Sequence, residues 1–234
     1  VDLLREISNP KNYDSVPNLH YRNKFECFVK SESDGIKNYV NELDSLDFPA
    51  YDLVDMEFYI DYSSTIVRAV LGDESKDIRA IPMVFTRGCP YECSFCYRLI
   101  RKWRHHSSEH VISNLQYLRK TYNINAVQLN DELVFVNKKW FISLCEDIAK
   151  SDIDFKFLTG GGKPDLVTED IIIAMKKAGF KRIGYGLESG SPTILDLMEK
   201  KASVDHNYNA MENTLKHGML TSANFVFGHP GENK

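Results

Sequence analysis

Three cysteines lie within eight residues of one another in the segment RGCPYECSFCYR, residues 87–98. The spacing C-x3-C-x2-C is formed by Cys89, Cys93 and Cys96. Each of three thiolates on so short a loop can take one iron of a cubane [4Fe–4S] cluster, whereas complete ligation by protein needs four. Cys145 falls in the apolar phase of a predicted helix, and Cys27 has no motif around it. The pattern therefore favours a cluster with one iron open to an external ligand.

Zinc is the alternative metal for this segment. A spacing of C-x2-C-x9-H-x3-H, close to that of structural zinc sites, is formed by Cys93, Cys96, His106 and His110. This ligand set leaves Cys89 without a role and predicts a non-catalytic, structural metal-binding module.

Composition limits the class of protein. With 234 residues, 43% of them hydrophobic, the chain can bury a substantial single-domain core. A net charge of −4 gives no general basic field for nucleic acid, and we expect the basic run at 98–106 to be a solvated linker. No apolar run approaches the ~20 residues of a membrane span. Five cysteines, three of them clustered, indicate metal binding in a reducing cytoplasm.

From Ile81 onward, predicted strands alternate with predicted helices. Strand-like runs are predicted at 81–85, 126–129, 155–158, 182–187 and 223–227. The helices between them are expected to begin at Ser108, Asn137, Thr168 and Ser191, and a further helix should bury Tyr208, Met211 and Leu215. We expect an α/β fold, a partial (β/α) barrel of about five parallel strands with its chemistry at their C-terminal ends. The polar residues 1–75, here called the leader, are predicted to form an irregular segment of turns and loops.

The segments at the strand ends resemble the radical S-adenosylmethionine (SAM) superfamily, in particular its cobalamin-binding branch. The cysteine motif follows the first strand, and NDELVFVNKKW follows the second. GLESGSP after the fourth strand and FGHPGE after the fifth are similar to segments of the same branch. The resemblance covers nearly the whole chain.

This resemblance implies cofactors and the residues that hold them. Cys89, Cys93 and Cys96 would bind a [4Fe–4S] cluster, and the amino and carboxylate groups of SAM would chelate its open iron. Contacts to SAM would come from Phe95 beside the adenine, Asp131 and Glu132 at the ammonium, Glu188 with Ser189, and Val226 in the adenine pocket. Lys163 stands where branch members usually carry arginine, and it would contact the SAM carboxylate as a single charge.

The implied reaction is reductive cleavage of SAM to methionine and a 5′-deoxyadenosyl radical, which abstracts hydrogen from a substrate. The electron would come from a donor such as flavodoxin or ferredoxin. Methyl transfer to an unactivated carbon is the leading activity, although the branch also contains ring-forming and rearranging members. The tRNA methylthiotransferases are an alternative that would need further domains and a second cluster.

The resemblance also predicts a domain organisation. We expect residues 1–75 to be a linker from an upstream, cobalamin-binding domain, and residues 76–234 to be a radical SAM core truncated after strand five. The chain begins with Val1, and YDSVPNLHYR is similar to such a linker. The sequence lacks the D-x-H-x-x-G loop that binds cobalt, so cobalamin is expected only in the full-length protein.

Overall fold

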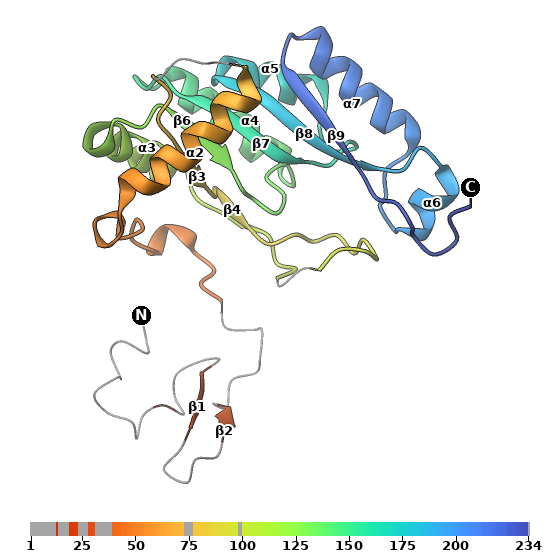
Figure 1. Cartoon of the computed structure of the whole chain (residues 1–234), viewed down its shortest axis with the longest axis horizontal. Coiled ribbons are helices and arrows are strands. Elements are labelled where there is room, and N and C mark those ends of the chain that lie inside the picture. Colours follow the sequence, from red (N-terminus) through yellow and green to blue (C-terminus); the bar gives the residue numbers. More distant parts are fainter. Residues whose placement is uncertain are drawn as a thin grey trace. The chain divides into compact units, whose positions relative to one another are not determined.

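The computed structural model of the chain (Figure 1) contains two compact units, residues Val1–Asn41 and Glu42–Lys234. It describes residue 13 and residues 19–22, 28–30, 39–72, 77–97 and 100–233. In the first unit, strands β1 (His20–Arg22) and β2 (Phe28–Lys30) pair in antiparallel fashion. The described residues exclude most of positions 1–38, Cys27 among them, and also the first two residues of the basic run 98–106. The second unit, here called the core unit, carries the cysteine motif.

A five-stranded parallel sheet forms the centre of the core unit (Figure 1). Its order follows the sequence: β3 (Ala80–Met83), β6 (Ala126–Leu129), β7 (Lys156–Gly162), β8 (Phe180–Glu188) and β9 (Leu220–Phe225). Among the described residues the sheet does not close, because β3 and β9 each pair with only one of these strands. The predicted fold, a partial barrel of about five parallel strands, is confirmed.

Helices connect the strands along the chain. Their bounds are α3 (Ser108–Tyr122), α4 (Lys138–Lys150), α5 (Glu169–Lys177), α6 (Pro192–Leu197) and α7 (Val204–Lys216). The predicted caps Asn137 and Ser191 each accept a backbone N–H bond at the helix start. Helix α3 begins one residue earlier than predicted, because Ser107 rather than Ser108 accepts the bond from His110 N, at 3.1 Å. Within the described residues no helix is long and apolar enough to cross a membrane.

Helix α2 (Met56–Leu71) follows the short 3-10 helices η3 (Leu43–Ser45) and η4 (Tyr51–Leu53), and it crosses in front of the sheet in Figure 1. The prediction of turns and loops is therefore wrong for this part of residues 1–75. Exposed aromatic side chains at Phe58, Tyr59 and Tyr62 obscure the helical period in the sequence. Ser64 Oγ accepts a hydrogen bond from Ala80 N at 2.9 Å, which ties α2 to the first strand of the sheet. The origin of residues 1–75 in an interdomain linker stays a prediction.

The two faces of the sheet are covered by two different hydrophobic clusters. Ala80, Ala126 and Leu158 pack with Val67 of α2 in one cluster. The residues next to them in the strands, Ile81, Val127 and Phe157, belong to the larger cluster with the buried faces of α3, α4 and α5. Both faces of the sheet are thus buried in this region.

Helix α7 packs through a face that the sequence did not predict. Of the predicted face, Met211 is partly buried and packs against the core, but Tyr208 and Leu215 are exposed; the buried residues are Asn207, Ala210 and Thr214. The polar members have partners on β8: Thr214 Oγ1 lies 2.7 Å from Tyr185 Oη, and Asn207 Nδ2 donates to Leu187 O at 3.2 Å. Side-chain hydrogen bonds to buried groups therefore decide the orientation of this helix.

Candidate cofactor site at the strand ends

The cysteine motif lies on a loop that is closed at its base. Strands β4 (Thr86–Arg87) and β5 (Arg104–His105) pair in antiparallel fashion on either side of the loop. Cys89 N donates to Ile100 O at 3.0 Å. Gly88 has φ +91°, and a Cβ there would lie 2.3 Å from Lys102 O, so only glycine fits where the two chain segments meet.

The tip of the loop is fixed to the segment that follows α6. Ser94 N donates to Met198 O at 3.0 Å, and Ser94 Oγ donates to Leu197 O at 3.2 Å. Within the tip, Cys96 N donates to Cys93 O at 3.1 Å. The loop is therefore held at both ends before any cofactor binds, which lowers the conformational entropy lost on binding.

The three thiols lie within one another's electrostatic influence. Cys89 and Cys93 are partly buried and Cys96 is exposed. Burial raises the pKa of Cys89, and Cys93, Cys96 and Glu132 act in the same direction. Burial also raises the pKa of Cys93, while Lys200 and Lys163 oppose that rise. Cys93 and Cys96 line an open hollow of about 290 Å³ together with Glu92, Ser94, Tyr97 and Arg101. Three thiols that influence one another's pKa, beside cationic groups, suit an iron–sulfur cluster.

Asp131 follows β6 and ties it to the start of the cysteine loop. Its Oδ1 accepts hydrogen bonds from Phe85 N at 3.0 Å, Thr86 N at 2.5 Å and Thr86 Oγ1 at 2.6 Å. Although the residue as a whole is partly exposed, its carboxylate is buried, and burial raises its pKa to about 6. Oδ2 is buried without a hydrogen-bond partner among the described residues. Asp131 thus holds the backbone at the start of the cysteine loop, a role that the sequence did not indicate. Its predicted contact with SAM would have to use Oδ2.

Glu188 ends β8 and forms a buried ion pair with Lys200. Glu188 Oε1 lies 2.7 Å from Lys200 Nζ, and the two side chains are 10% and 9% exposed. Lys200 Nζ also lies 5.8 Å from the centroid of the Phe95 ring, on the cysteine loop. Glu188 has φ +63°, and a Cβ on Gly186 would lie 2.4 Å from Glu188 Oε1, so the pair needs the glycine. No sequence pattern indicates Lys200, which lies outside the predicted helices and strands.

Lys163 follows β7 and is buried beside the same loop. Its Nζ contacts Asp165 Oδ1 at 2.5 Å and Lys201 O at 3.3 Å. The same atom lies 4.5 Å from the centroid of the Tyr91 ring. Burial lowers the pKa of Lys163, and the hydrogen bond to Asp165 counteracts that effect. Lys163 and Lys200 therefore place two ammonium groups next to Cys93.

The remaining predicted residues lie around this group. Glu132 is exposed, and its charge contributes to the raised pKa of Cys89. Ser189 is buried, and its Oγ accepts a hydrogen bond from Ser191 N at 3.1 Å. Val226 is partly exposed, and its N–H bonds to Glu188 O at 3.0 Å. Cys145 is buried in α4, as the helical pattern predicted.

The alternative zinc site is not formed in the part of the chain that the structure describes. His106 and His110 meet Asp44 instead of Cys93 and Cys96. The zinc ligand set drawn from the spacing of cysteines and histidines is therefore wrong, because His106 after β5 and His110 in α3 both lie beside Asp44 of η3.

Comparison with known proteins defines the class. The model of the radical SAM superfamily matches residues 83–234, so the chain belongs to this superfamily. Enzymes of this superfamily use a [4Fe–4S] cluster and SAM, which are the cofactors that the sequence predicted. The match begins at the end of β3 and includes every residue of the site described above.

Two named proteins are similar in sequence to this chain. The chain is 25% identical over 236 residues to an uncharacterized methyltransferase of Pyrococcus horikoshii, covering 100% of this chain and 47% of the relative. It is 28% identical over 156 residues to the anaerobic magnesium-protoporphyrin IX monomethyl ester cyclase of Rubrivivax gelatinosus, covering 65% of this chain and 28% of the relative. The chain thus spans less than half the length of these relatives.

Solved structures share the fold. The cobalamin-dependent SAM radical enzyme OxsB, solved with aqua-cobalamin and SAM bound, has a TM-score of 0.72 and 21% identity, covering 96% of this chain and 31% of that chain. The radical SAM methyltransferase TsrM of Kitasatospora setae, solved with cobalamin and a [4Fe–4S] cluster, has a TM-score of 0.73 and 15% identity, covering 99% and 44%.

Proposed function

We propose that Cys89, Cys93 and Cys96 hold a [4Fe–4S] cluster and that the strand ends around them bind SAM for reductive cleavage. The observation that carries this proposal is the loop itself: it is closed at its base by β4 and β5 and fixed at its tip to Met198, with the three thiols between. When bound and reduced, the cluster supplies the electron that splits SAM into methionine and a 5′-deoxyadenosyl radical.

The two buried lysines have an electrostatic role in this proposal. Three thiolates and a SAM carboxylate bring negative charge into a partly buried site, where charges interact strongly. Lys163 and Lys200 offset that charge beside Cys93. Glu188 keeps the Lys200 ammonium in place through the 2.7 Å ion pair. Phe95, 5.8 Å from the same ammonium, offers a ring face on which the adenine can stack.

Glu132, Asp131, Ser189 and Val226 complete the proposed SAM site. Glu132 offers an exposed carboxylate near Cys89 for the SAM ammonium. Asp131 holds the backbone of Phe85 and Thr86, so it positions the start of the loop whether or not its Oδ2 contacts SAM. Ser189 and Val226 directly follow β8 and β9, and Val226 N donates to Glu188 O.

For the whole protein we propose a cobalamin-dependent methyltransferase. Relatives that carry the name methyltransferase, and fold neighbours described as cobalamin-dependent, support this activity. Cobalamin would be held by a domain outside this chain, and a small electron carrier such as flavodoxin or ferredoxin would reduce the cluster. Ring formation is a second candidate, supported by the likeness to the anaerobic magnesium-protoporphyrin IX monomethyl ester cyclase.

Anaerobic reconstitution with iron and sulfide tests the cluster. We expect about four irons per chain, and the loss of iron when Cys89, Cys93 or Cys96 is replaced by alanine. Cys145→Ala is the matched control, because this thiol is buried in α4, and it should keep the full iron content. Stoichiometric zinc without iron in the native chain would show that the cluster assignment is wrong.

SAM binding and cleavage need separate measurements. Adding SAM to the reduced cluster should change its electron paramagnetic resonance spectrum, because the open iron gains nitrogen and oxygen ligands. Reduced protein with SAM should release 5′-deoxyadenosine, measured by chromatography, and Cys93→Ala should release none. An unchanged spectrum at saturating SAM contradicts the open-iron site.

A further inference from the structure

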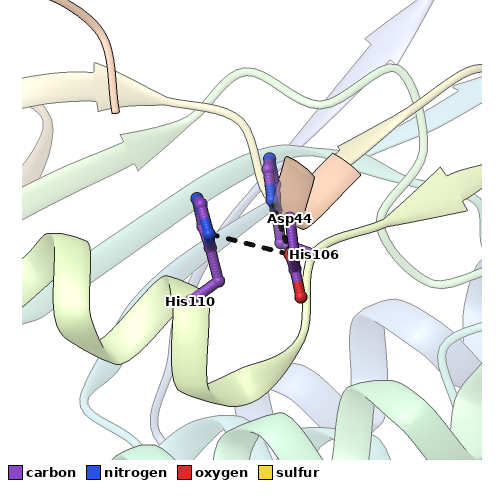
Figure 2. Close-up of side chains that lie close together, drawn as sticks. All are labelled: Asp44, His106 and His110. Atoms are coloured by element: carbon purple, nitrogen blue, oxygen red, sulfur yellow. Dashed lines mark hydrogen bonds and ion pairs between the residues drawn. The ribbon is translucent and has the colours of Figure 1, made fainter. Parts of the chain in front are cut away.

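Two histidines and an aspartate from three segments meet beside the base of the cysteine loop (Figure 2). Asp44 belongs to η3, His106 follows β5, and His110 lies in the first turn of α3. Their ligand atoms all lie within 4.8 Å of one another. None of the three contributes to the proposed SAM site, so this cluster needs an explanation of its own.

Hydrogen bonding accounts for only one of the two contacts between histidine and aspartate. His106 Nδ1 lies 3.0 Å from Asp44 Oδ1, but His110 Nδ1 lies 3.8 Å from the same oxygen, beyond hydrogen-bond distance. The two imidazole rings stack face to face, with centroids 4.3 Å apart and planes 13° apart. Figure 2 shows both rings turned toward Asp44, so two ring nitrogens converge on one carboxylate oxygen.

The separations lie within a few tenths of an ångström of those between ligands that share one ion. Zinc–nitrogen and zinc–oxygen bonds of about 2.0–2.2 Å place two ligands of a tetrahedral site roughly 3.3–3.5 Å apart. The observed 3.0 Å and 3.8 Å lie on either side of that range. Movements of a few tenths of an ångström in the two side chains would bring both pairs to the ideal separation.

Neighbouring groups already hold the three ligands. Ser107 N donates to Asp44 Oδ1 at 3.1 Å and to Oδ2 at 3.2 Å, which fixes the carboxylate at the start of α3. Phe48 packs edge-on against the His110 ring, with centroids 5.0 Å apart. Trp140 Nε1 donates to His106 O at 3.0 Å. The His106 and His110 side chains are 12% and 17% exposed, whereas Asp44 is 41% exposed, so one side of the cluster is open to solvent.

We propose that Asp44, His106 and His110 bind one divalent transition-metal ion, with a coordination position left on the solvent side for water. Two imidazoles and one carboxylate suit zinc or a similar ion, whereas magnesium and calcium prefer oxygen ligands alone. The ion would connect residues 62 positions apart in the sequence. It would therefore fasten η3 to the end of β5, where the cysteine loop closes.

Metal binding is best measured where the cysteines cannot compete. We suggest a parent variant with Cys89, Cys93 and Cys96 all replaced by serine, titrated with Co²⁺ by absorbance and with Zn²⁺ by calorimetry. We expect one ion per chain, and cobalt bands without thiolate charge transfer. His110→Ala and Asp44→Asn in this parent should each weaken binding by at least about 100-fold, more than the loss of an outer contact costs. His105→Ala, which changes the neighbouring histidine outside the cluster, should bind normally.

Two further measurements keep the test decisive if a variant folds poorly. Zinc should raise the Tm of the parent and of His105→Ala but not that of His110→Ala, with circular dichroism reporting the fold of each. X-ray absorption of the zinc-loaded parent should show two imidazole ligands. Fewer than two imidazoles, no saturable binding of one ion by the parent, or unchanged affinity in a folded His110→Ala would each overturn the proposal.

Discussion

The buried ion pair between Glu188 and Lys200 makes a quantitative prediction. With side chains 10% and 9% exposed and a 2.7 Å contact, removing one partner leaves an uncompensated charge away from water. Such a loss costs roughly 3–5 kcal/mol in the free energy of unfolding. We expect that cost for Glu188→Gln and for Lys200→Met. Because 1 kcal/mol shifts Tm by about 2–4 °C in a chain of this size, each Tm should fall by about 6–20 °C.

The double variant distinguishes an ion pair from two independent packing contacts. Glu188→Gln with Lys200→Met removes both charges, so its stability should return to within about 1 kcal/mol of the native chain. Urea unfolding followed by circular dichroism gives all four free energies of the cycle. If the costs of the two single changes add to within about 0.5 kcal/mol, the two groups are not coupled and the reasoning fails.

An exposed ion pair provides the control. Lys138 Nζ lies 2.8 Å from Asp170 Oδ2, but these side chains are 48% and 52% exposed. Solvent screens such a pair, so Lys138→Met should cost no more than about 1 kcal/mol. A similar loss in both variants would mean that burial is not the cause.

Three further predictions concern the elements around the loop. Gly88→Ala should abolish iron uptake on reconstitution while α-helical circular dichroism persists, since its Cβ would lie 2.3 Å from Lys102 O; full iron content would contradict the close approach. Asp131, with a pKa raised from 3.8 to about 6, holds its proton in the folded state at pH values where the unfolded chain has released it. The free energy of unfolding should therefore fall between pH 4 and 7 by on the order of 2 kcal/mol, and urea titrations of Asp131→Asn should lack this component; an identical pH profile in the variant would count against it. Ser64→Ala leaves Ala80 N without its acceptor and should cost about 1–3 kcal/mol in thermal melts, whereas an unchanged Tm would show that the bond contributes nothing.

The sequence predicts the strands and the helix starts because local patterns determine them. The run AVQL at 126–129 is strand β6 residue for residue. Asn137 and Ser191 cap helices where their side chains precede an apolar period. The cysteine spacing likewise places the loop after the first strand of the sheet, and it does so without knowledge of any distant contact.

Contacts between distant segments could not be predicted in the same way. Lys200 meets Glu188 only because the chain turns back after α6, with Glu199 and Lys201 both at positive φ. Asp44 reaches His106 across 62 positions, and no spacing rule connects them. The exposed side of α7 was mistaken for its buried side because Tyr208 is apolar and Asn207, which is buried, is not.

The bond from Ser94 to Met198 has a consequence for how the protein is made. The cysteine loop and its anchor are 104 positions apart, and the sheet adds its strands in sequence order. At roughly 5–20 residues per second, a ribosome needs about 5–20 s to reach Met198 after completing the loop. During that interval the tip of the loop lacks its hydrogen bonds to Leu197 and Met198. We therefore expect the loop to take up iron only after Met198 has been synthesised, and oxidants to damage the thiols of shorter nascent chains more readily than those of finished chains.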